Sequence, residues 1–143
     1  MKEIVTEIEI HATPERVWKV LTDCRAYSEW NPFVYDVRGE IEVGNHFEAM
    51  LKTPERRPVK LRGLVLKMVP RREFRWQGNL GFTGLFDGEY VFEIHSPAPK
   101  LVRFTNRKVY KGLLTSMVFS RTIDRIRRGV EAMNFALKQR CES

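Results

Sequence analysis

Apolar and polar residues alternate along most of this chain, which is the pattern of β-strands with one buried face. The alternation starts in residues 2–11 and returns in successive segments between residues 33 and 111, separated by short turns. In residues 59–69 it slips near Gly63, which indicates a β-bulge there. Strands joined by short turns pair antiparallel, so the pattern predicts one antiparallel sheet.

Three helical segments interrupt or follow these strands. Thr13 and Pro14 predict the start of a short helix that ends near Asp23, because the hydroxyl caps the first turn and proline has no N–H to lose there. A second short helical turn is expected at residues 26–30. The strongest signal covers residues 113–140, where apolar residues recur every three or four positions at Phe119, Ile123, Ile126, Val130, Met133 and Leu137.

These elements predict a single α+β domain that spans residues 1–143. We expect a seven-stranded, curved antiparallel sheet wrapped around the long C-terminal helix, with two short N-terminal helices. Twisted strands cannot lie flat under one helix, so the sheet must curl around it. Wherever the inward side chains do not all touch, this arrangement encloses a concave, mostly apolar site.

The stretch TPERVWKVLTDCRAYSEWNPFV at residues 13–34 resembles the first helices of the START-like helix-grip superfamily, also called SRPBCC or polyketide cyclase/dehydrase-like. The matching positions are Pro14, Val17, Trp18, Leu21, Thr22, Asp23, Tyr27, Trp30, Asn31 and Pro32. The segment GVEAMNFALKQRCE near the C-terminus is also similar to the last helix of that family. The resemblance implies the helix-grip fold over essentially the whole chain, and it assigns the tryptophans of the first stretch a mainly structural role.

The net charge of +7 comes entirely from residues 71–143, which hold 14 Lys and Arg against 7 Asp and Glu. These basic residues are dispersed and do not alternate with aromatic ones, so we expect no specific nucleic-acid partner. Transient contact of this half with an acidic membrane surface stays open. No apolar run is long enough for a transmembrane segment, and the acidic N-terminus is unlike a signal peptide, so the expected location is cytoplasmic.

Neither a metal nor a cofactor is predicted, and no catalytic residue is assigned. His11, His46 and His95 fall on different strands without the spacing of a zinc site, and the chain has neither a GxSxG nor a phosphate-binding glycine motif. The inward polar candidates are Asn106, Tyr35, Tyr90 and Tyr110. Asn106 needs hydrogen-bond partners when buried, and either a tyrosine hydroxyl or a ligand would supply them.

The sequence favours binding or transport of a small hydrophobic ligand, lipid- or polyketide-like, in an internal cavity. The expected lining is Trp30, Phe33, Tyr35, Phe47, Trp76, Phe86, Tyr90, Phe92, Phe104, Asn106, Phe119 and Met133. Entry is expected between residues 81–88, the short helices and the start of the long helix. The alternative is a polyketide cyclase or aromatase that uses polar groups in the same cavity, and a third class is an interaction protein with a filled interior. The ligand's identity and the choice between monomer and homodimer stay open.

Overall fold

The computed structural model describes residues 2–79, 87–111 and 115–143, and for residues 2, 111 and 115–123 it describes the backbone only. The elements follow the predicted order of one strand, short helices, six strands and a long helix. They are β1 (Lys2–Ile10), α1 (Pro14–Thr22), the 3-10 helix η1 (Cys24–Glu29), β2 (Val34–Arg38), β3 (His46–Leu51), β4 (Val59–Val69), β5 (Glu73–Asn79), β6 (Asp87–Ala98), β7 (Leu101–Lys111) and α2 (Thr115–Glu142).

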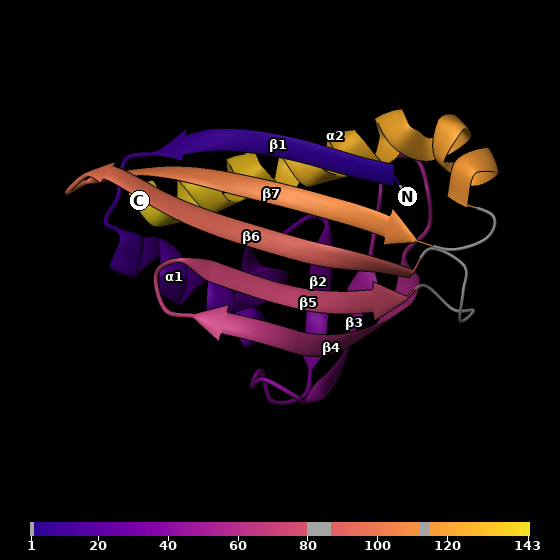
Figure 1. Ribbon diagram of the computed structural model, residues 1–143, viewed down its shortest axis with the longest axis horizontal. Coiled ribbons are helices and arrows are strands. Elements are labelled where there is room, and N and C mark those ends of the chain that lie inside the picture. The colour runs from indigo at the N-terminus through magenta and orange to yellow at the C-terminus, as the bar shows by residue number, and fades with distance from the viewer. Residues whose placement is uncertain (1, 80–86, 112–114) are drawn as a thin grey trace.

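The seven strands form one antiparallel sheet in the order β1-β7-β6-β5-β4-β3-β2. Figure 1 shows the sheet curling around α2, which lies behind β1 and β7. The α1 helix lies at the left end of the sheet in this view, on the same side as the C-terminus of the chain. The α2 helix contacts β1, β7 and α1. The predicted α+β fold, with its curved sheet, long C-terminal helix and short N-terminal helices, is confirmed.

The N-terminal helices begin and end where local side chains satisfy the backbone. The Thr13 hydroxyl accepts a hydrogen bond from the backbone N–H of Arg16 at 3.1 Å, which caps α1. After η1, the Asn31 side-chain oxygen accepts from the backbone N–H groups of Phe33 and Val34 at 2.9 and 3.0 Å. The Trp-Asn-Pro turn is therefore held by the amide of Asn31, which directs the chain into β2.

Two details of the sheet differ from the sequence prediction. Gly63 pairs regularly with Phe47 on β3 and Gly78 on β5, and the bulge in β4 lies between Val65 and Lys67. The glycine interrupts the apolar pattern without interrupting the pairing, because the Phe47 ring covers it.

In β2 the alternation is offset by one residue. Asp36 has a left-handed φ of 52°, and the pairing with β3 is irregular between Tyr35 and Arg38. Val34 pairs with the buried Leu51, so Tyr35 and its partner Met50 lie on the opposite, outer face. The expectation that Tyr35 points inward is therefore wrong, because the extra residue at Asp36 shifts the period.

The long helix buries the predicted apolar stripe where its side chains are described. Val130, Met133 and Leu137 are fully buried, and Ile126 is partly buried. Gly129 lets Phe33 approach the helix, since a Cβ at this position would lie 2.8 Å from the Phe33 ring. The side chains of Phe119 and Ile123 lie outside the described residues.

Candidate functional site

The strand register places two rows of side chains on the inner face of the sheet. One row runs from Ile4 on β1 through Lys108 and Tyr90 to Trp76 on β5. The next row holds, in the same strand order, Thr6, Asn106, Phe92 and Phe74. All eight side chains are buried. The rows are aromatic over β5 and β6 and polar over β7, and on β1 they end in the apolar Ile4 and the polar Thr6, where α2 packs.

The aromatic part is a continuous set of ring contacts. Trp76 stacks on Tyr90 with centroids 3.9 Å apart and planes 8° apart, and Phe47 and Trp76 form a T-shaped pair with centroids 5.2 Å apart. A third row, directly beside the first, contains Gly63, Gly78 and Gly88 in register. Because these positions carry no side chain, the rings lie close over the backbone.

The polar part is centred on the amine of Lys108, which is fully buried. Its Nζ lies 4.4 Å from the ring centroids of both Tyr90 and Phe92 and 5.8 Å from that of Phe33. It donates a hydrogen bond to the Asn106 Oδ1 atom at 2.7 Å. Among the described residues no carboxylate pairs with this amine. Burial therefore holds the pKa of Lys108 well below its ordinary value of 10.5.

A chain of hydrogen bonds fixes the orientation of Asn106. The Thr6 hydroxyl donates to the backbone oxygen of Asn106 at 3.2 Å, so it accepts from Asn134 Nδ2, which lies 2.8 Å away. The Asn134 Oδ1 atom then accepts from Asn106 Nδ2 at 2.9 Å. Because the Nδ2 group of Asn106 donates to Asn134, its Oδ1 atom faces Lys108. The network therefore links β1, α2 and β7, and the donor and the acceptor of each hydrogen bond in it are fixed.

Most of the predicted lining residues meet in this interior. Phe33, Phe47, Trp76, Tyr90, Phe92, Phe104 and Met133 belong to one buried cluster, and the fully buried Asn106 borders it through Met133. Tyr35 lies on the outer face of β2, as described above. Phe86, and with it most of the expected entry segment, falls outside the described residues, as does the side chain of Phe119.

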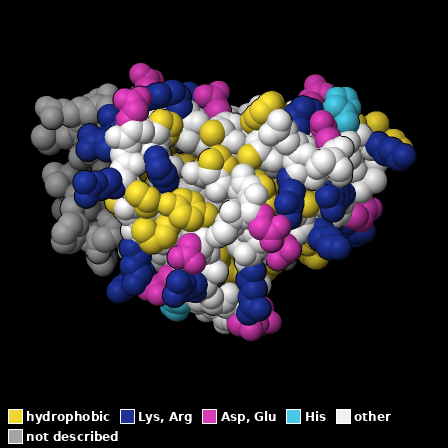
Figure 2. All heavy atoms as spheres, turned by 180° about the vertical axis from the view of Figure 1, so that it is seen from behind, with side chains coloured by type: hydrophobic (Ala, Val, Ile, Leu, Met, Phe, Trp, Pro, Cys, Tyr) yellow, Lys and Arg dark blue, Asp and Glu magenta, His cyan; other side chains and the backbone are white. Residues whose placement is uncertain are grey.

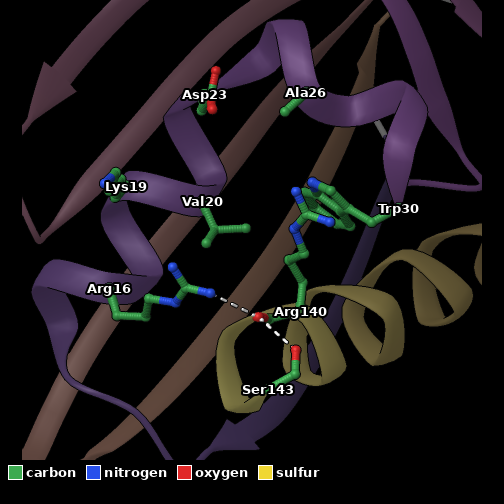
Figure 3. A pocket seen from close by; sticks show the side chains of 8 residues that line it. All are labelled: Arg16, Lys19, Val20, Asp23, Ala26, Trp30, Arg140 and Ser143. Carbon is green, nitrogen blue, oxygen red and sulfur yellow. Dashed lines mark hydrogen bonds between the residues drawn. The ribbon is translucent and has the colours of Figure 1, made fainter.

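Trp30 is placed in a surface groove of about 270 Å³ between α1, η1 and the end of α2 (Figure 3). Its ring forms a T-shaped pair with the Tyr27 ring, with centroids 5.1 Å apart. Arg16 donates to the backbone oxygen of Arg140 at 3.1 Å across this groove, and Arg140 pairs with Glu29 at 2.7 Å. Both guanidinium groups therefore already have partners within the protein.

Sequence reasoning missed the residues that make the interior polar, namely Lys108, Thr6 and Asn134. A signal was present for two of them. Lys108 has the same parity as the inward Phe104, Asn106 and Tyr110, and Asn134 continues the helical spacing of Val130 and Leu137. The expectation for Asn106 is also corrected, since its amide is satisfied by Asn134 and Lys108 rather than by a tyrosine hydroxyl or a ligand.

Other candidate chemistry is sparse in the described part of the chain. His11, His46 and His95 are exposed, as the alternation predicts, and no group of three or more metal-ligating side chains gathers among the described residues. Figure 2 shows basic side chains spread over one face and interleaved with acidic ones. Within the described residues, no helix is long and apolar enough to span a bilayer.

Comparisons with known proteins agree with this architecture. The ZhuI aromatase/cyclase from Streptomyces sp. R1128 is 11% identical with a TM-score of 0.81, over 99% of this chain and 93% of that one. Protein Ms6760 from Mycobacterium smegmatis is 14% identical with a TM-score of 0.78, over 96% and 88%. Protein MLL2253 from Mesorhizobium loti is 18% identical with a TM-score of 0.73, over 96% and 95%.

At such identities these structures show a shared fold and nothing more. No curated protein matches the sequence. The family assignment comes instead from a sequence model, described as polyketide cyclase / dehydrase and lipid transport, which matches residues 1–142. Because the match covers almost the whole chain, this protein belongs to the polyketide cyclase/dehydrase and lipid transport family.

Proposed function

We propose that the protein binds a small hydrophobic ligand against the inner face of its sheet, beside Lys108. The observation that carries this proposal is a fully buried amine, set among aromatic rings, without a carboxylate partner in the described residues. Burying such a group is costly, and a core that serves stability alone is better filled with apolar side chains. Perturbed titratable groups in apolar surroundings are common at binding and catalytic sites.

The composition of the interior suits a ligand that is mostly apolar with one or two polar atoms. Rings of Trp76, Tyr90 and Phe92 supply apolar surface, and Lys108 and Asn106 supply the polar groups. Ligand sites generally combine a largely apolar lining with few placed polar groups. Because Lys108 is fully buried, neighbouring side chains must move for a ligand to touch it.

The experiment is a titration with 1-N-phenylnaphthylamine, a neutral dye whose emission rises in apolar surroundings. In the variant Met133→Trp a larger side chain occupies the interior, whereas Phe135→Trp changes an exposed residue of the same helix. We expect the first substitution to weaken dye binding at least tenfold and the second to leave it unchanged. Circular dichroism establishes that both variants are folded. Equal binding by both variants, or no binding by the wild type, would overturn the proposal.

A second candidate function is that of a cyclase or aromatase acting on a polyketide-like substrate in the same interior. The buried amine of Lys108, held by the side chain of Asn106, favours this candidate, because lysine amines act as nucleophiles toward carbonyl substrates. The test is incubation with a poly-β-ketone surrogate and analysis of the products by mass spectrometry. An enzyme of this class would convert the surrogate, and Lys108→Met would abolish conversion while the fold survives. A carrier would return the surrogate unchanged.

A further inference from the structure

We infer that Lys108 forms an imine with an aldehyde or ketone group of the bound ligand, so that the ligand class is a hydrophobic carbonyl compound. This inference rests on the proposed function, because the carbonyl must first reach the interior.

The hydrogen bond that the Lys108 amine donates to Asn106 does not use the lone pair of its nitrogen. A neutral amine has two N–H groups and one lone pair, and here one N–H is donated to the Asn106 Oδ1 atom at 2.7 Å. Asn106 cannot turn away, since its Nδ2 group donates to Asn134 and that residue donates to Thr6. The network therefore anchors the nitrogen without consuming its lone pair.

The amine rather than the ammonium form suits this environment. Lys108 is fully buried, and no carboxylate among the described residues compensates a charge on it. Burial lowers its pKa, which increases the neutral fraction near pH 7. A lysine desolvated in an apolar site is one of the established ways to make an amine nucleophilic.

The same geometry disfavours a carboxylate ligand that would simply pair with the lysine. The faces of Tyr90 and Phe92, 4.4 Å from the Nζ atom, carry negative electrostatic potential, and the Asn106 Oδ1 atom is a further negative pole. An anion at this point would be repelled from three sides.

The proposed step is balanced without an oxidant or reductant. The lone pair of the Lys108 nitrogen attacks the carbonyl carbon, and a C–N bond forms while the C=O π bond breaks. The nitrogen gives up its two protons, the former carbonyl oxygen receives them, and the oxygen leaves as water. The product is a C=N bond between lysine and ligand, and hydrolysis reverses the step.

The experiment uses 2-naphthaldehyde with sodium cyanoborohydride at pH 7, which reduces an imine to a stable secondary amine. Intact-mass measurement counts the adducts, and peptide mapping locates them among the nine lysines. We expect labelling of Lys108 at least tenfold faster than labelling of the exposed Lys60 and Lys100. The preference should vanish in urea, because it depends on the folded site. Mapping the wild-type protein needs no variant, so the test holds even where Lys108→Met fails to fold.

A pH profile separates an activated amine from a merely accessible one. Between pH 7 and 8 the labelling of an ordinary lysine rises about tenfold, since its neutral fraction does. Labelling of Lys108 should rise less. In Asn106→Leu, loss of the anchor should slow labelling of Lys108 and leave labelling of the exposed Lys100 unchanged.

The outcomes distinguish this inference from the proposed function. Labelling that follows the exposure of the lysines, together with binding of 1-N-phenylnaphthylamine, would overturn the inference and leave the proposed function standing. Tighter binding of 2-naphthoate than of 2-naphthaldehyde would also overturn it, because Lys108 would then pair with an anion. Failure of both dye binding and labelling would overturn both.

Discussion

Replacement of Lys108 by methionine should change how the stability of the protein depends on pH. In the wild type the pKa of Lys108 is well below 10.5 in the folded state because of burial, and it is ordinary in the unfolded state. Between those two values the unfolded chain binds more protons than the folded one. The free energy of unfolding therefore rises with pH in this window, by up to about 1.4 kcal/mol per pH unit for one proton. As the pH falls, this stability is lost until the folded lysine is protonated too.

Methionine has a similar length and no titrating group, so Lys108→Met should remove this slope. The variant also leaves the Asn106 Oδ1 atom without its donor, which costs about 1–3 kcal/mol but does so equally at every pH. The pH-dependent change in the free energy of unfolding can therefore be separated from the pH-independent cost of the unpaired Oδ1 atom. The control is Lys100→Met, in the exposed turn between β6 and β7, which should keep the wild-type slope.

The assay is urea denaturation at several pH values between 6.5 and 8.5. The Cys24 thiol, whose pKa burial raises to about 12, and the buried tyrosines are common to both proteins, so their contribution cancels in the difference between the wild type and Lys108→Met. We expect the difference between the wild type and Lys108→Met to grow in favour of the wild type as the pH rises. Parallel curves would mean that Lys108 titrates alike in both states, and the case for a neutral buried amine would fail.

Three further substitutions or measurements test the packing around the site. Gly63→Ala should destabilise the protein by about 1–3 kcal/mol in thermal denaturation, because the new Cβ would lie 2.1 Å from the Phe47 ring. Adding Phe47→Leu should restore part of this stability, and a double variant without any recovery would refute the clash with Phe47 as the cause. Asn134→Leu should cost about 1–3 kcal/mol in urea denaturation, since Asn106 loses its acceptor, whereas an unchanged midpoint would contradict the network. The Cys24 thiol should resist Ellman's reagent at pH 8 until the protein unfolds, and fast reaction in the native state would show that it is not buried.

The fold could be predicted from sequence because its signals are local and repetitive. Alternation identified the strands, and the spacing of Val130, Met133 and Leu137 identified the long helix. The prediction erred at Tyr35 and at the bulge in β4. A single extra residue changes the face that every later side chain takes, and no local property of the residues near Asp36 or Leu66 marks the insertion.

The apolar half of the site was also predictable, whereas its polar half was not. Phe47, Trp76 and Phe92 are apolar residues with inward parity, so pattern alone places them inside. Lys108 also lies at an inward position of its alternating strand. Lysine is almost never fully buried, however, so the residue type argued against an inward side chain more strongly than the alternation argued for one. Its partners come from β1 and α2, which are far away in sequence, and only the assembled sheet brings Thr6 and Asn134 together.

The central claim is that a hydrophobic ligand occupies the interior and not a surface groove. Proton–carbon NMR of protein labelled at the methionine methyl groups tests it, because Met133 lies inside beside Asn106 whereas Met50 lies on the outer face of β3. On saturation with 1-N-phenylnaphthylamine we predict a large shift of the Met133 methyl resonance and an unchanged Met50 resonance. An unmoved Met133 signal, with shifts instead in the indole of Trp30 in the groove of Figure 3, would place the ligand outside and contradict the account.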